Sequence, residues 1–476
     1  MNDIDYLLQI ENKYGLLYDK IDDFSYWVFF RHDIMWRLLK RKNAYGEAHN
    51  LRNVSRAKKI KLRMKMIKYA LFYHHVNIRN VDALILNHER RVWNEDHYEC
   101  IYTDDIAKQF DRAVVLERPY QQSHFRPVDT KNLVYTDWIE VMATAKLYFN
   151  KFIAKKKYIQ IKEQVKTKIQ VACDELSEMM HVSYDLDSFA GLIADGYFLY
   201  HKKKKMFAKL IERYQPKVIL EVVSYNMDCM IVNELAENFK IPTIELQHGA
   251  TGREHLAYNY PDGVFIRQFP QYYFSFSQFW CEEARYPIPL EQRKNVGFPH
   301  IEKKMDEKVG ISQEKNKVIL FISQGPIGEV LSNLAVELNK RINREEYKII
   351  YKLHPGEYTG WRERYMNLAN SDIEVVDSNK VDLYELFAIS NFQVGGYGST
   401  AIFEGLYFGL ITCIYEKGAV EYLQSLCRKG IALPFQNVEE LYKLIQENPK
   451  KEKQNENFWT RGALQNIMRE IQMIVG

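Results

Sequence analysis

Short apolar runs alternate with amphipathic stretches in two parts of the chain. In the first part, apolar runs at 81–91, 113–119, 216–226 and 241–249 predict buried strands, and residues 227–240 have helical periodicity. In the second part, the same alternation resumes after residue 315. Strands are expected there at 317–323, 347–355, 373–377, 391–396 and 410–416, and helices at 327–342, 382–390 and 399–409.

This rhythm predicts an α/β fold, because strands that alternate with helices of this length build parallel sheets through right-handed crossovers. We expect two doubly wound, Rossmann-like domains that face each other across a cleft. The first, 1–295, carries additional N-terminal helices within 22–80, and an aromatic, proline-containing connector at 258–300 joins the two sheets. The second spans 296–455, and residues 456–476 are expected to form a helix that returns towards the first domain.

Composition and charge indicate the cellular compartment of the protein more clearly than they indicate its function. The formal net charge of +4 does not by itself indicate a nucleic-acid partner, although 56–68 and 202–205 are locally basic. The 6 cysteines have no CxxC spacing, which is typical of a reducing compartment without a disulfide framework. No signal peptide and no run of 18 apolar residues is present, so we expect a cytoplasmic protein, at most attached to a membrane surface.

Glycines and hydroxyl groups follow a predicted strand in "VGGYGST", residues 394–400. Gly396 and Gly398 allow tight turns and a close approach of the backbone to a ligand. Ser399 and Thr400 then add hydroxyls at a helix N-terminus, where free N–H groups and the helix dipole favour phosphate. The other interpretation is a glycine-rich turn capped by Ser399. Glu404, one helical turn later, is a candidate for binding ribose hydroxyls, or else a solvent-facing glutamate.

A His-Pro pair follows another predicted strand of the second domain, in "KLHP", residues 352–355. A protonated His354 beside a phosphate would stabilise the charge that develops when a nucleotide leaves. Lys352 and Pro355 belong to the same candidate donor site. So does the first loop of the domain, with Ser323, Gln324 and Gly325.

Candidate residues of the first domain also follow strands. His248, in "ELQHG", is a candidate base for an acceptor hydroxyl, but it could instead contact the donor phosphates or cap the strand. Glu254 lies on the same loop and is a second catalytic candidate. The candidate acceptor-binding residues are His88, Arg90, Asp105 and Gln247.

Several common active-site motifs are absent from the sequence. It has no Walker lysine, no GxSxG elbow and no GxGxxG after a first strand, which argues against a P-loop enzyme, a serine hydrolase and an NAD enzyme. No His/Cys/Glu cluster has metal-ligand spacing, and "TDD" at 103–105 is the nearest approach to a DxD motif. We therefore expect chemistry without a metal or another cofactor.

Together, "KLHP", "GYGST", "ELQHG" and "VGFPHIEK" (296–303) resemble motifs of bacterial GT-B glycosyltransferases that build capsule and other surface polysaccharides. Sialyltransferases, Kdo transferases and CDP-glycerol glycerophosphotransferases belong to the same wider group. The resemblance covers 216–440 well and 1–215 only loosely. It implies that His354, Ser399 and Thr400 bind the donor phosphate, and that a first-domain residue acts as base in an inverting displacement. The two hydroxyl residues are Ser399 and Thr400 here, whereas relatives have two serines, so the resemblance does not identify the nucleotide donor.

The sequence therefore predicts a glycosyltransferase that moves a sugar from a nucleotide donor, with CMP-sugars favoured, to a cell-surface glycan or lipid-linked acceptor. Alternatives are a polyol-phosphate transferase, a nucleotide-sugar 2-epimerase and a non-catalytic partner in capsule assembly. Lysines and arginines interleave with apolar residues at 54–72, which indicates either an anionic membrane surface as a further partner or a solvated helix face. The sequence predicts no oligomeric state.

Overall fold

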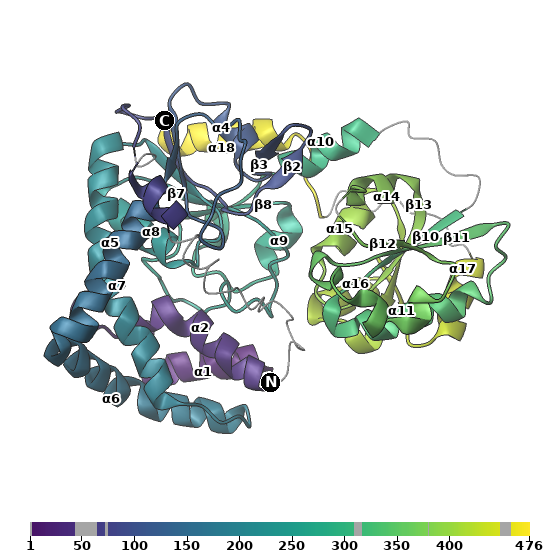
Figure 1. Ribbon diagram of the computed structural model, residues 1–476, viewed down its shortest axis with the longest axis horizontal. Coiled ribbons are helices and arrows are strands. Elements are labelled where there is room, and N and C mark those ends of the chain that lie inside the picture. Colours follow the sequence, from purple (N-terminus) through teal and green to yellow (C-terminus); the bar gives the residue numbers. More distant parts are fainter. Residues whose placement is uncertain (1, 43–63, 72–74, 309–316, 379, 448–457) are drawn as a thin grey trace.

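Two α/β lobes, each built around a parallel sheet, make up the protein (Figure 1). The computed structural model describes residues 2–42, 64–71, 75–308, 317–378, 380–447 and 458–476. The strands at the centre of each sheet are short and buried, as expected for parallel sheets that are covered on both faces, whereas strands at the edges are partly exposed. The predicted α/β class with two doubly wound domains is confirmed.

The sheet of the first lobe has seven parallel strands in the order β5-β4-β1-β6-β7-β8-β9. Their bounds are β1 Ala83–Leu86, β4 Ala113–Glu117, β5 Leu133–Tyr135, β6 Val218–Glu221, β7 Thr243–Leu246, β8 Tyr272–Ser275 and β9 Arg293–Asn295. A small antiparallel hairpin, β2 Val92–Asn94 and β3 His97–Glu99, follows β1. Because β6 and β7 are neighbours, the segments that follow them open at the same sheet edge.

Helices surround this sheet, and the N-terminal pair braces a loop near the cleft. Their bounds are α1 Asp3–Tyr14, α2 Tyr26–Arg41, α4 Asp104–Ala107, α5 Asp137–Tyr148, α6 Lys155–Met179, α7 Leu186–Tyr214, α8 Met227–Phe239, α9 Gln278–Glu282 and α10 Pro299–Lys308. Arg31 of α2 is buried and pairs with Glu11 at 2.6 Å. Its guanidinium also donates to the carbonyls of Leu256 and Asn259, at 3.0 and 2.8 Å. These bonds anchor the end of the loop that follows β7.

The sheet of the second lobe has six parallel strands in the order β12-β11-β10-β13-β14-β15. Their bounds are β10 Lys317–Ile322, β11 Tyr347–Lys352, β12 Glu374–Val376, β13 Ser390–Gly395, β14 Ile411–Tyr415 and β15 Leu433–Phe435. Its helices are α11 Gly328–Asn339, α12 Trp361–Arg364, α13 Met366–Ala369, α14 Leu383–Ile389, α15 Thr400–Tyr407, α16 Glu421–Arg428 and α17 Val438–Glu447. The neighbouring strands β11, β10 and β13 end in the loops that carry the candidate donor site.

The C-terminal helix α18, Ala463–Val475, lies on the first lobe (Figure 1). Its Ile467 and Ile471 join the apolar core formed by the strands of the first sheet. The carboxylate of Glu302 accepts hydrogen bonds from the N–H groups of Gly462 and Ala463, at 2.7 and 2.9 Å, where the helix begins. The chain therefore crosses back from the second lobe to the first.

Aromatic side chains join the two lobes beneath the cleft. Trp280 of the first lobe packs against Phe403 of the second, with ring centroids 4.6 Å apart. Its indole N–H donates to the carbonyl of Phe458, and that of Trp459 donates to the carbonyl of Phe403. This apolar contact fixes one end of the interface, and the catalytic candidates lie in the loops above it.

One feature differs from the sequence prediction, and another lies largely outside the described residues. The predicted connector 258–300 contains β8 and β9, which extend the first sheet, because a short polar strand such as Arg293–Asn295 leaves no apolar run to recognise. Of the basic stretch 54–72, only 64–71 lies within the described residues, where it is helical. Among the described residues, no helix is long and apolar enough to cross a membrane.

Candidate functional site

His354 stands directly after β11, at the start of a short 3-10 helix, Pro355–Glu357. Its side chain is exposed, and its Nδ1 accepts a hydrogen bond from the N–H of Gly356 at 3.1 Å. Because Nδ1 is the acceptor in this hydrogen bond, Nε2 carries the proton of the neutral ring and can donate a hydrogen bond to a ligand. Desolvation by the surrounding protein lowers the pKa of His354, Arg90 and Lys352 add to this effect, and Glu357 opposes it. A phosphate beside the ring would act in the opposite direction.

A buried carboxylate, Glu357, holds the His354 loop in place. It accepts hydrogen bonds from the backbone N–H of His354 at 2.9 Å, from the hydroxyl of Ser323 at 3.0 Å and from the hydroxyl of Tyr365. Gly328 is needed beside this network, because a Cβ atom there would lie 2.5 Å from Glu357 Oε1. The sequence analysis did not identify Glu357.

Replacing Glu357 with alanine should lower the free energy of unfolding by about 1–3 kcal/mol, because it leaves three donors without their buried acceptor. It should also lower activity, since the His354 loop loses its anchor. Urea unfolding of the variant measures the first effect, and exposed Glu345→Ala is the matched control. An unchanged midpoint in Glu357→Ala would show that the network does not hold this loop.

The glycine-rich segment after β13 turns sharply into α15. Tyr397 has a φ of +54°, and Ser399 precedes the helix with an extended backbone. Ser399 is buried but makes no side-chain cap hydrogen bond, so its hydroxyl is not used by the helix. Thr400 begins α15. Gly396 and Gly398 lie in tight surroundings, where a Cβ atom would meet Ile327 at 3.0 Å and the Tyr422 hydroxyl at 2.9 Å.

Glu404 lies one turn into α15 and is half-buried rather than solvent-facing. Burial raises the pKa of Glu404 to about 7, although a hydrogen bond from Tyr384 opposes the shift. Its negative charge in turn raises the pKa of Tyr102, which belongs to the first lobe. Burial is the main cause of the raised Tyr102 pKa, so the charge of Glu404 adds only a smaller contribution across the two lobes.

His248 follows β7 and belongs to a cluster of aromatic and ionisable groups. Its side chain is 15% exposed, and burial lowers its pKa to about 3, so the ring is a neutral base at pH 7. The Tyr258 hydroxyl lies 3.4 Å from Nδ1 and the Tyr225 hydroxyl 3.5 Å from Nε2. The hydroxyl of Tyr102 donates to the carbonyl of His248 at 2.8 Å. These contacts fix the loop and the ring.

Glu245 lies behind His248 and was not predicted as a site residue. It is fully buried on β7, with one carboxylate oxygen 3.8 Å from His248 Nδ1. Burial raises the pKa of Glu245 to about 7, against hydrogen bonds from Tyr258 and Ser224 that favour the charged form. Its second oxygen has no hydrogen-bond partner among the described residues. The hydroxyl of Tyr258 donates to the other carboxylate oxygen and also lies 3.4 Å from His248 Nδ1, so it links the carboxyl group of Glu245 to the imidazole.

The loops of the two lobes meet at one place. A Cβ atom on Gly249 would lie 3.9 Å from Thr400 Oγ1, and one on Gly252 would lie 3.2 Å from the ring of Tyr422. Glu254 is close enough to Tyr397 and Tyr422 to raise the pKa of both phenols. Arg90 is close enough to His354 to lower the pKa of its imidazole. The loop after β7 therefore faces the glycine-rich segment.

Four predicted site residues are placed differently. Gln247 is buried, and its amide bonds the carbonyl of Gly249 and the N–H of Phe276, so it shapes the loop and does not face the cleft. The hydroxyl of Ser323 is likewise buried in the Glu357 network. The ammonium of Lys352 donates to the Tyr358 hydroxyl and the Ser378 carbonyl, and burial lowers its pKa to about 8.

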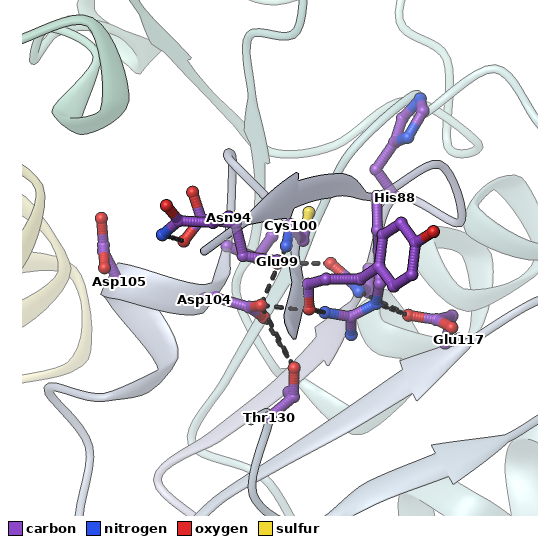
Figure 2. Close-up of polar contacts among 12 residues, drawn as sticks. His88, Asn94, Glu99, Cys100, Asp104, Asp105, Glu117 and Thr130 are labelled. Atoms are coloured by element: carbon purple, nitrogen blue, oxygen red, sulfur yellow. Dashed lines mark hydrogen bonds and ion pairs between the residues drawn. The ribbon is translucent and has the colours of Figure 1, made fainter. Parts of the chain in front are cut away.

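Asp105 is the fourth, and it points away from the hydrogen-bonded group that surrounds its neighbour Asp104 (Figure 2). Asp104 accepts hydrogen bonds from the guanidinium of Arg91, the N–H of Cys100 and the hydroxyl of Thr130. Arg91 also pairs with buried Glu117 at 2.6 Å. The "TDD" segment is therefore a structural ion-pair centre.

The remaining predicted residues lie in the loops at this edge. His88 follows β1, with its Nδ1 accepting from the N–H of Arg90 at 3.1 Å and its ring centroid 6.5 Å from that of His248. Gln324 and Gly325 follow β10, where Gly325 is exposed. Pro355 is the first residue of the 3-10 helix after His354. Among the described residues, no group of three or more His, Cys, Asp or Glu side chains is arranged to hold a metal ion.

Solved structures with the same architecture are similar to most of the chain. A UDP-GlcNAc 2-epimerase from Neisseria meningitidis bound to UDP-GlcNAc is 13% identical, with a TM-score of 0.50 over 82% of this chain and 99% of that one. The S. aureus MnaA structure with UDP is 14% identical, with a TM-score of 0.47 over 83% of this chain and 97% of that one. MurG from Acinetobacter baumannii is 13% identical, with a TM-score of 0.38 over 58% of this chain and 78% of that one. No protein-family model and no curated protein sequence matches the chain.

The likeness to the epimerase from Neisseria meningitidis supports the fold, and the narrower resemblance to capsule-type transferases stays a prediction. Two parallel-sheet lobes, joined by a C-terminal helix that returns to the first, make up the architecture. The chain therefore has the two-lobed α/β architecture of the predicted GT-B fold, in common with the UDP-GlcNAc 2-epimerase from Neisseria meningitidis.

Proposed function

We propose that the protein is a glycosyltransferase that binds a nucleotide-activated sugar in the second lobe and an acceptor hydroxyl in the first. The observation that carries this proposal is the meeting of the loop after β7 with the glycine-rich segment, where Gly249 approaches Thr400. One loop offers a base and the other offers phosphate-binding groups. A group transfer between two substrates needs both at one place.

The donor phosphate would lie between His354, the glycine-rich segment and Arg90. Nε2 of His354 is free of the cap, the hydroxyls of Ser399 and Thr400 stand at a helix N-terminus, and Arg90 adds a positive charge from the first lobe. These groups bind anions without a metal ion. Glu404, one turn into α15, would accept hydrogen bonds from ribose.

His248 would remove the proton from the acceptor hydroxyl. The neutral ring is accessible, and Glu245 behind it can stabilise the imidazolium that forms. The acceptor oxygen then forms a bond to the anomeric carbon while the bond to the nucleotide phosphate breaks, with inversion. We favour a CMP-sugar donor and a cell-surface glycan acceptor, as the sequence motifs imply. A CDP-polyol donor is the alternative, in which the acceptor oxygen would form its bond to the phosphorus of the polyol phosphate while the diphosphate P–O bond breaks and CMP leaves.

A nucleotide-sugar 2-epimerase is the second candidate, favoured by the likeness to the epimerase bound to UDP-GlcNAc. The two functions differ in whether an acceptor is needed. Incubation in EDTA with UDP-GlcNAc or a CMP-sugar, with and without glycan acceptor, followed by mass spectrometry and NMR, distinguishes them. The proposal predicts free nucleotide and an extended acceptor only in the complete mixture. A 2-epimer formed from the donor alone, or a strict need for added Mg²⁺, would overturn it.

Thr400→Val tests the phosphate site with little change in shape. The variant removes one hydroxyl and should weaken nucleotide binding about tenfold or more, since hydrogen bonds to charged groups contribute about 1.5–3 kcal/mol. Isothermal titration with the nucleotide product measures the dissociation constant. Exposed Thr359→Val, on the loop after His354, is the matched control. Equal affinity in wild type and Thr400→Val would remove the glycine-rich segment from the donor site.

A further inference from the structure

An exposed apolar patch lies where α5 runs into α6, far along the chain from the proposed site. Phe152 and Ile153 are each 73% exposed, Tyr148 is 52% exposed and Phe149 is 45% exposed. We call residues 146–157 the α5–α6 tip. Four large apolar side chains next to one another in sequence exceed the scattered exposure that is normal for a soluble surface. Such a patch indicates a binding surface.

The exposed apolar side chains belong to a segment with regular secondary structure. Phe149–Ile153 forms one turn of π-helix between the two α-helices, and the rings of Tyr148 and Phe152 stack with centroids 5.9 Å apart. Buried Asn150 donates to the carbonyl of Lys146, and Lys151 pairs with Asp195 of α7 at 2.7 Å. The Lys151–Asp195 ion pair joins the turn to α7, and the apolar side chains of the turn remain exposed.

Exposed lysines flank the apolar residues in the sequence of the same tip. Lys155, Lys156 and Lys157 form the first turn of α6, are exposed and have no acidic residue among them. Lysines are unfavourable at a helix N-terminus, where the dipole is already positive, so the cluster does not serve the stability of the helix. Lys146 adds a fourth positive charge, with its ammonium 4.9 Å from the centre of the Phe149 ring.

We propose that the α5–α6 tip docks the protein on an anionic lipid bilayer, with the apolar side chains in the interface and the lysines against lipid headgroups. Apolar side chains rimmed by lysines are the composition that binds such surfaces. A second copy of the chain fits less well, because two-fold symmetry would bring the lysine clusters of both copies together. α5 and α6 lie on the side of the first lobe away from the second (Figure 1), so docking leaves the second lobe free. The proposal concerns a different segment from 54–72 and does not depend on the proposed function.

Vesicle flotation of the full chain tests the proposal. Wild type should float with vesicles that contain phosphatidylglycerol, bind phosphatidylcholine vesicles at least about tenfold more weakly, and dissociate at high salt. Phe152→Ser/Ile153→Ser should lower binding about tenfold or more, and Lys155→Gln/Lys156→Gln/Lys157→Gln should remove the preference for anionic lipid. The matched control is Val330→Ser/Met366→Ser, which replaces two exposed apolar residues of the second lobe and should bind like wild type.

Three results would overturn the proposal. The first is wild type that does not float with anionic vesicles, and the second is tip variants that float as well as wild type, which would place the contact elsewhere. The third is a wild-type dimer in light scattering that Phe152→Ser/Ile153→Ser converts to monomer, which would assign the tip to a second copy. Circular dichroism of the variants checks that each is folded.

Discussion

Replacing His354 with alanine is expected to lower kcat/KM by about 10²–10³-fold, since removal of one group that stabilises developing charge has that effect in other enzymes. The ring contributes in two ways: Nδ1 caps the 3-10 helix through Gly356, and Nε2 can donate to phosphate. Alanine removes both. Steady-state transfer to the acceptor measures the loss.

His354→Asn separates the two roles. An asparagine oxygen can replace Nδ1 as the acceptor of the Gly356 N–H, because asparagine is a good capping residue, but it supplies nothing at the position of Nε2. The account therefore predicts that His354→Asn keeps wild-type stability and loses as much activity as His354→Ala. His97→Ala, on β3, is the control. Full activity in His354→Asn would reduce His354 to a cap, and full glycan output from His354→Ala would favour a non-catalytic partner.

Glu245→Gln is expected to lower kcat by about 10²–10⁴-fold, in the range of lost acid–base assistance. In wild type, activity should rise as pH increases through about 7, where Glu245 loses its proton and becomes able to stabilise the imidazolium of His248. The glutamine variant should lack this limb of the pH profile. A purely structural role for Glu245 would lower activity equally at all pH values.

The free energy of unfolding should fall with increasing pH over the range in which activity rises. The folded-state pKa of Glu245 is raised, so between its ordinary value and about 7 the folded protein holds a proton that the unfolded chain has lost. Its contribution to stability is therefore largest at low pH and falls as pH rises through this window. Glu245→Gln removes the fall and should be at least as stable as wild type at pH 8. A destabilised variant at pH 8 would contradict this charge assignment.

Glu221→Gln is the matched control, because Glu221 lies opposite Glu245 on the neighbouring strand β6 and is equally buried. Its carboxyl group accepts a hydrogen bond from Asn233 of α8 at 2.8 Å. The account predicts near wild-type activity for Glu221→Gln. Equal losses in both variants would indicate a general effect of the buried carboxyl pair.

The fold could be predicted from the sequence because buried parallel strands appear as short apolar runs. Val318–Ile322 and Ala83–Leu86 are such runs, and both are central strands. Edge strands carry less of this signal: Arg293–Asn295 is polar and was predicted as part of a connector. Among the four lysines at 202–205, Lys203 is buried and pairs with Asp228 at 2.8 Å, which a charge run does not reveal.

The site could be predicted only where backbone chemistry marks it. His-Pro after a strand and glycines before a helix leave local signals, and these led to His354 and Thr400. Arg90 and Arg91 look alike in sequence, yet Arg91 is buried between Asp104 and Glu117 while Arg90 is exposed beside the cleft. Glu245 lies inside an apolar strand, and its contact with His248 depends on how the loop after β7 folds back. Such roles follow from tertiary packing.

A thermal-shift titration with CMP, CDP, UDP and GDP tests the central claim most directly, because a ligand that binds only the folded state raises its stability in proportion to RT ln(1 + [L]/Kd). The claim is that His354 and the glycine-rich segment form one nucleotide-phosphate site. The account predicts that at least one of these nucleotides raises the Tm of wild type by several degrees, and that His354→Asn and Thr400→Val reduce the shift. A wild-type Tm unchanged by all four, or shifts equal in wild type and both variants, would contradict it.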